Sequence, residues 1–136
     1  MDLTTISRLR AIPLFAELDE RALALSAGVA TEFEASAGHV LVERGQEGAG
    51  MFVLEEGTVI VDLPGGRTLN RGPGEFFGEL ALLGGGPRSA RVRAATAVRC
   101  LAIGRRDFAQ LLESEPRIAV AMLPVLARRL ADAATD

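Results

Sequence analysis

The chain has 136 residues, a length that fits one compact domain, and 49% of them are hydrophobic, enough to fold around a core of its own. Its formal net charge of -3 argues against a surface that binds nucleic acid or other polyanions. No apolar run approaches the roughly 20 residues that cross a bilayer, so we expect a soluble protein with no membrane partner.

The cysteine content and the N-terminus bear on the cellular compartment. Cys100 is the only cysteine, which excludes an intramolecular disulfide, and the N-terminal stretch lacks the apolar centre of a signal peptide. We therefore expect a cytoplasmic protein. Cys100 lies in the apolar run from Val98 to Ile103, where we interpret it as a buried structural thiol.

The N-terminal segment is predicted to be helical. Apolar residues recur with helical spacing from Ile6 to Leu14, and this pattern stops near Pro13. Asp19 is suited to cap a short second helix from Glu20 to Ala27, which Gly28 would end.

The middle of the chain changes to short apolar runs that are typical of β-strands. Turns rich in glycine and proline separate these runs, and this spacing predicts an antiparallel sandwich or barrel. The predicted strands are Val40–Val42, Met51–Leu54, Val59–Val61, Ala90–Ala95 and Val98–Ile103. One segment of strong helix formers, Glu79–Leu83, interrupts them.

The end of the chain predicts two more helices, Arg105–Leu112 and Arg117 to about Ala133. Pro124 lies inside the second one and is expected to kink it. This helix is apolar around most of its circumference, so it needs two surfaces to pack against, which we interpret as the sheet and a second subunit. We predict a single domain over residues 1–136, with helices in 1–28, the β-region with its binding segment in 29–103 and C-terminal helices in 104–136.

The segment from Gly74 to Val92 carries the chemistry. A helix that starts just after Gly78 leaves its first N–H groups without partners, and these groups favour an anion. Nine residues beyond Glu79, Arg88 offers a planar fork of donors for phosphate oxygens. Glu79 is an acceptor among apolar neighbours, and a sugar hydroxyl would satisfy it. This combination predicts a nucleotide ligand.

The same segment resembles the phosphate-binding cassette of the cyclic nucleotide-binding domain family. The family pattern is roughly F-G-E, a small apolar helix, a variable loop and P-R-[STA]-A. This chain has Phe77-Gly78-Glu79, Leu80-Ala81-Leu82-Leu83 and Pro87-Arg88-Ser89-Ala90. The resemblance extends over nearly the whole chain, with similar residues at Ile12–Phe15, Gly38–Gly45, Met51–Gly57 and Asp107-Phe108.

The resemblance implies a mainly β fold with flanking α-helices, an eight-stranded β jelly-roll barrel. It also implies a 3′,5′-cyclic nucleotide as ligand, with cyclic AMP favoured over cyclic GMP. The cyclic phosphate would bind Arg88, the Ser89 hydroxyl and the backbone near Gly78, and Glu79 would accept from the ribose 2′-hydroxyl. The implied ligand-binding residues are Phe77, Gly78, Glu79, Leu80, Ala81, Arg88, Ser89, Ala90 and Arg129.

The resemblance further implies that the last helix closes over the base as a lid and signals by moving. Arg129 matches an arginine that transcription activators of the family carry near the base. The threonine and serine that contact the base in those activators fall at Ala133 and Ala134, which lack hydroxyls. The lid contacts are therefore expected to differ from those of the activators.

Other readings of the sequence stay open. The chain could be a jelly-roll interaction module that has lost nucleotide binding, a regulatory subunit for a separate effector protein, or a fragment of a longer protein. A homodimer through the last helix is a further expectation. We expect no enzyme activity, because no acid–base pair or nucleophile arrangement emerges, and no metal, because His39 is the only histidine. Arg91 and Arg93 alternate with Val92 and are interpreted as solvated.

Overall fold

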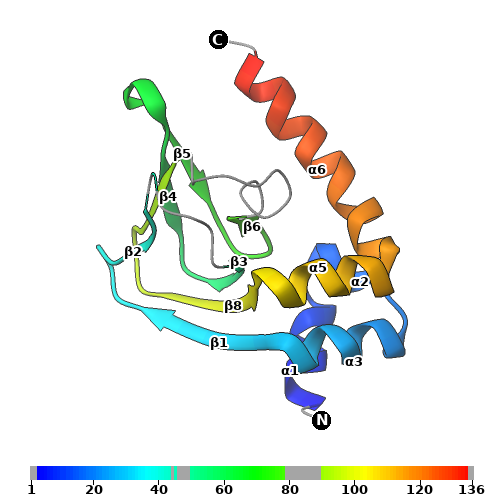
Figure 1. Ribbon diagram of the computed structural model, residues 1–136. Coiled ribbons are helices and arrows are strands. Elements are labelled where there is room, and N and C mark those ends of the chain that lie inside the picture. Colours follow the sequence, from blue (N-terminus) through cyan, green and yellow to red (C-terminus); the bar gives the residue numbers. More distant parts are fainter. Residues whose placement is uncertain (1–2, 44, 46–49, 79–89, 135–136) are drawn as a thin grey trace. The chain divides into compact units, whose positions relative to one another are not determined.

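The computed structural model describes residues 3–43, 45, 50–78 and 90–134 (Figure 1). The chain divides into two compact units. One is a β unit, Val29–Ala109, and the other is a helical unit made of Met1–Gly28 and Gln110–Asp136.

Two antiparallel sheets of four strands form the β unit. The first sheet has the order β1 (Ala30–Ala35), β8 (Val98–Gly104), β3 (Gly50–Glu56) and β6 (Phe76–Phe77). The second has the order β2 (Val40–Val42), β7 (Arg91–Ala94), β4 (Val59–Asp62) and β5 (Thr68–Arg71), with a 3₁₀ turn at Pro64–Gly66 between β4 and β5.

The eight strands of the described residues match the number implied by the family resemblance. The prediction of a mainly β fold with flanking helices is confirmed. Within the described residues the two sheets share no ladder of hydrogen bonds, so they are not closed into a barrel.

The core between the sheets follows the alternation expected of half-buried strands. In β4, Val59 and Val61 are buried whereas Ile60 and Asp62 are half-buried. Residues from both sheets join in one cluster, namely Val42, Leu54, Val59, Val61, Phe77, Val92, Ala94, Val98 and Cys100. Cys100 lies in this cluster with no exposed surface, so the prediction that its thiol is buried is confirmed.

All five predicted apolar runs form strands, whereas β1, β5 and β6 were not predicted from their residues. The sequence of β1, Ala-Thr-Glu-Phe-Glu-Ala, contains no apolar run, and its burial pattern shows no strict alternation. β5 lies at the edge of its sheet, and β6 has two residues, too few to show a period.

The N-terminal helices are α1 (Leu3–Arg10), α2 (Pro13–Ala16) and α3 (Glu20–Val29). The predicted helix over Ile6–Leu14 is in fact two, because Pro13 starts α2 in its first turn. Asp19 caps α3 as predicted, since its carboxylate accepts a hydrogen bond from the Ala22 N–H at 2.9 Å. Gly28 does not end α3, which continues to Val29.

The C-terminal helices are α5 (Arg105–Ser114) and α6 (Pro116–Ala134), close to the predicted bounds. α6 continues through Pro124 and packs against α2. Ile118 and Met122 on α6 are buried, but Val120, Leu123 and Leu130 are 63%, 62% and 74% exposed. Within the described residues, α6 therefore buries one apolar face and leaves another in solvent. None of the described helices combines the length and the apolar character needed to cross a bilayer.

Candidate functional site

The structure describes the two flanks of the predicted cassette. Phe77, at the end of β6, and Gly78 begin it, and Ala90 ends it just before β7. The other predicted ligand-binding residues of the cassette lie outside the described residues: Glu79, Leu80, Ala81, Arg88 and Ser89.

Phe77 anchors the first flank in the core. It is 3% exposed and lies opposite Phe52 in the β3–β6 pair. The two rings stack at 5.1 Å between centroids, and Phe33 meets Phe52 edge-on at 5.6 Å. The cassette therefore begins at a residue whose ring is packed in the core against other aromatic rings.

Gly78 turns the chain away from β6. Its φ angle of 89° lies in the left-handed region, which a side chain disfavours and glycine accepts. This conformation fits the sequence argument, in which Gly78 stands where the backbone must bend and lie close to a ligand. It also explains in physical terms why the Phe77-Gly78 pair has glycine as its second member.

The second flank is tied to the second sheet. Ala90 is half-buried and packs against the core cluster, and Val92 two residues later is buried in it. β7 lies between β2 and β4, so the end of the cassette joins an interior strand that has a neighbour on each side.

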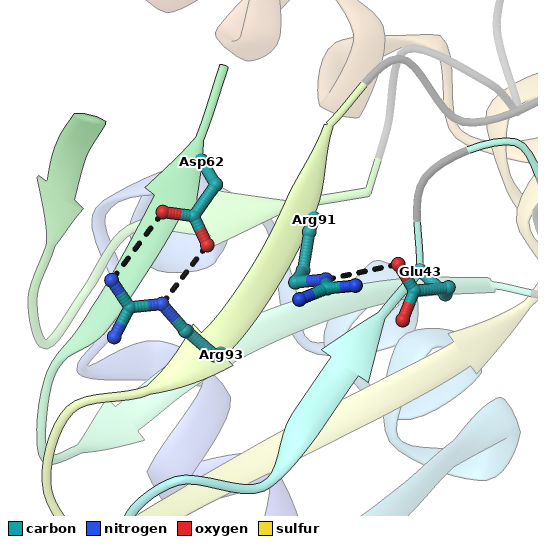
Figure 2. A network of polar contacts seen from close by, with 4 residues as sticks. All are labelled: Glu43, Asp62, Arg91 and Arg93. Carbon is teal, nitrogen blue, oxygen red and sulfur yellow. Dashed lines mark hydrogen bonds and ion pairs between the residues drawn. The ribbon is translucent and has the colours of Figure 1, made fainter. Parts of the chain in front are cut away.

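Two ion pairs fasten β7 to its neighbours on the outer face of this sheet (Figure 2). The Arg91 Nε donates to Glu43 Oε1 at 2.9 Å, next to β2. The Arg93 Nε donates to Asp62 Oδ2 on β4 at 2.9 Å, and its Nη2 donates to Oδ1 at 3.4 Å.

In these ion pairs a carboxylate compensates the positive charge of each arginine. The hydrogen bond to Asp62, with the charge of that carboxylate, raises the pKa of Arg93 above its ordinary value. Both side chains share the solvent-facing side as predicted, with 48% and 41% of the Arg91 and Arg93 side chains exposed. Because each charge is compensated by a carboxylate, these residues hold β7 in place and are poor candidates for attracting an anion.

Arg129 belongs to the helical unit. It lies on α6, one turn and a half beyond Pro124, and its side chain is half-buried. Its role near a base stays a prediction.

Sequence reasoning missed β5 and the position of its residues opposite β4. Leu69 and Arg71 on β5 lie opposite Val61 and Val59, two members of the core cluster. Leu69 is nevertheless 39% exposed, and Arg71 is half-buried. Thr68–Arg71 contains a single apolar residue and shows no alternating burial, so its sequence carries no strand signal without its partner strand.

A hollow of about 390 Å³ lies at the other end of the sandwich, where the chain turns from β7 into β8. Arg99 in its lining pairs with Glu34 at 3.4 Å and Glu56 at 3.7 Å. The lining residues are Glu34, Ala35, Ser36, Glu56, Ala97, Val98 and Arg99. Among the residues described, no group of three or more His, Cys, Asp and Glu could hold a metal ion.

The comparisons with known proteins point to one family. The chain matches the family described as "Cyclic nucleotide-binding domain" over residues 32–115. It is 41% identical over 109 residues to the cyclic nucleotide-gated potassium channel mll3241 of Mesorhizobium japonicum. That match covers 80% of this chain and 30% of the channel, so the chain spans less than a third of this relative.

Solved structures of other proteins share the fold, among them the following two. The catabolite activator protein of Thermus thermophilus matches with a TM-score of 0.78 and 31% identity, over 89% of this chain and 59% of that one. The N-terminal domain of a transcriptional regulator from Streptomyces coelicolor A3(2) matches with a TM-score of 0.68 and 37% identity, over 93% and 94% of the two chains. The two-sheet fold, the flanks of the cassette and these matches agree: the chain belongs to the cyclic nucleotide-binding domain family.

Proposed function

We propose that the chain is a regulatory module that binds a 3′,5′-cyclic nucleotide and does no chemistry on it. The observation that carries this proposal is the intact cassette sequence within the family match over residues 32–115. The anchored Phe77 and the left-handed Gly78 support it, because they place the start of the cassette on a rigid core.

In this proposal the cassette grips the two polar parts of the ligand. Arg88 forms a bidentate contact with the cyclic phosphate, and the Ser89 hydroxyl and the backbone N–H groups after Gly78 add donors. Glu79 accepts a hydrogen bond from the ribose 2′-hydroxyl. Because both parts of the ligand are common to all 3′,5′-cyclic nucleotides, the contacts of Arg88 and Glu79 supply affinity without choosing the base.

The base is chosen elsewhere, and we propose a modest preference for cyclic AMP. Ser89 follows the cassette arginine and can assist cyclic GMP, while Ala133 and Ala134 lack the hydroxyls that favour adenine in the activators. The segment of α6 after Pro124 closes over the base and brings Arg129 toward it. Movement of this segment is the proposed signal.

The output depends on partners. The matched channel and the matched catabolite activator are both longer than this chain. We propose that this chain regulates an effector protein in the cytoplasm. On α6 the exposed residues Val120, Leu123 and Leu130 follow one side of the helix, with the spacing of an apolar seam. We assign this seam to a homodimer, which sedimentation velocity would show as a species of twice the chain's mass.

Thermal unfolding with added ligand tests the proposed function. A ligand that binds the native state alone raises the melting temperature by mass action, so cyclic AMP and, to a smaller extent, cyclic GMP should raise it. Adenosine 5′-monophosphate, which lacks the cyclic phosphate, is the matched control. If neither cyclic nucleotide shifts the transition at millimolar concentration, the second candidate holds, a jelly-roll interaction module without nucleotide binding.

A further inference from the structure

Among the strands of the described residues, β1 is the longest that lies at the edge of a sheet (Figure 1). It has six residues, whereas the other edge strands β6, β2 and β5 have two, three and four. Its residues pair with β8 in an uninterrupted antiparallel register, and in the same part of the chain no strand pairs with its other side. Alternate residues of such a strand direct their N–H and C=O groups away from the sheet, where a further strand can pair with them.

The outward side of β1 is acidic. Phe33 and Ala35 pack against the core cluster, so the residues that alternate with them, Glu32 and Glu34, face the opposite side of the sheet. Both glutamates are exposed. A strand added beside β1 would therefore meet carboxylates at alternate positions.

Glu34 is the first member of a row of charges that crosses the first sheet. Arg99 on β8 lies opposite Glu34 on one side and opposite Glu56 of β3 on the other. Its guanidinium pairs with both carboxylates, at 3.4 Å and 3.7 Å. The charges thus alternate along the row, and two carboxylates share one cation. A positive side chain beside Glu34 on an added strand would continue this alternation, because opposite charges on neighbouring strands stabilise each other.

The hollow of about 390 Å³ adjoins this row. Glu34, Glu56 and Arg99 line it, together with small side chains. Because the lining carries two carboxylates and one guanidinium, it has one negative charge in excess. The hollow therefore favours the cationic end of a long side chain and disfavours an anion.

We propose that β1 is a docking edge for an extended segment of a partner protein that carries arginine or lysine at alternate positions. The segment pairs with β1 as a fifth strand of the first sheet. In this mode of recognition, backbone hydrogen bonds give affinity and alternate side chains give specificity. The basic side chains of the segment lie beside Glu32 and Glu34, and the one beside Glu34 reaches the hollow. The contact needs no cyclic nucleotide, so it is independent of the proposed function.

A second copy of the chain is a poor occupant of this edge. Two β1 strands paired antiparallel around Phe33 would place Glu32 of one copy opposite Glu34 of the other. Like charges directly opposite each other destabilise a strand pair. The same carboxylates that disfavour self-pairing favour a basic segment, and this charge pattern selects the partner.

Fluorescence anisotropy of a labelled peptide tests the docking edge with the nucleotide-free chain. The probe is an eight-residue peptide, blocked at both ends, in which arginine alternates with valine or threonine. Glu34→Gln should bind it about threefold more weakly, the size of one exposed charge pair between strands. Glu34 is exposed, so this change should leave the fold intact. The matched control is Glu113→Gln, which removes an exposed carboxylate from α5 and should leave the affinity unchanged.

A modified peptide separates strand pairing from simple attraction between opposite charges. Methyl groups on all its backbone nitrogens remove the donors that a strand needs and keep the charge, so this peptide should bind at least tenfold more weakly. Hydrogen exchange then locates the contact. The amides of β1 should exchange more slowly when the unmodified peptide is added, whereas those of β5, at the edge of the other sheet, should not change.

Three results would overturn the docking edge. The first is no binding of the unmodified peptide at millimolar concentration. The second is equal binding of the methylated and unmodified peptides, which would show attraction to an acidic surface alone. The third is protection of β5 amides in place of those of β1. None of these results bears on the binding of cyclic nucleotide, which the thermal unfolding experiment tests separately.

Discussion

At the scale of single residues, position in the sheet decides what a side chain does. Arg71 and Arg93 are the same residue type, but Arg93 meets Asp62 on the outer face and Arg71 meets Val59 on the inner one. The sequence could not separate them, because all 15 basic residues are arginine and the pairing register is absent from the sequence. The burial of Cys100 was predictable, because the residues of an apolar, β-type run are buried whichever strands they pair with.

The buried thiol makes stability depend on pH in a defined window. Burial, with a smaller effect of the Glu55 charge, raises the pKa of Cys100 to about 11. The unfolded chain loses this proton first, since its thiol titrates at about 8.5. The stabilising effect of the buried thiol is therefore complete below the pKa that the thiol has in the unfolded chain. It is lost as the pH rises toward the pKa of the thiol in the folded chain.

Urea unfolding between pH 8 and 11 measures this effect. The free energy of unfolding should fall with a slope of at most about 1.4 kcal/mol per pH unit. The sequence contains no tyrosine and no lysine, so Cys100 is the one side chain that titrates in this window. Cys100→Ala should remove the slope, and the same slope in both proteins would show that the thiol is not responsible.

At the scale of elements, the apolar strands and the helices were predictable and the edge strands were not. A run such as Val59–Val61 carries its own pattern, and Asp19 marks the start of α3 by its capping chemistry. β1 depends on β8, which lies far along the chain, and β5 depends on β4, the strand just before it. Their polar residues become strand residues only when paired. The cassette was identified by its resemblance to the family. The structure adds the left-handed conformation of Gly78 at its start and the strands on either side of it.

α6 is the element proposed to move. A ligand shifts an equilibrium only by its difference in affinity for the two states, so a lid must gain contacts when nucleotide binds. Hydrogen exchange of the amides from Val125 to Ala133 should therefore slow on addition of cyclic AMP. The amides of α3 serve as the internal reference. Equal exchange in both states would mean that α6 is not the lid, and Pro124→Ala should alter the exchange of the ligand-free chain alone.

At the scale of the whole molecule, the chain joins a binding unit to a helical one. The β unit, Val29–Ala109, contains the described ends of the cassette and the ion pairs of β7. The helical unit combines residues from both ends of the chain and contains α6 with its exposed seam. In the proposed function, binding in the β unit is reported by the helical unit.

The binding of the cyclic phosphate by Arg88 is the central claim. Isothermal titration with cyclic AMP compares the wild-type chain with Arg88→Ala and Arg88→Lys. Truncating one partner of a desolvated charge pair costs roughly 2–5 kcal/mol, so Arg88→Ala should bind about thirtyfold more weakly or worse. Arg88→Lys should also bind poorly, because lysine lacks the bidentate fork. Wild-type affinity in both variants would contradict the account, since the phosphate would then be held by something other than Arg88.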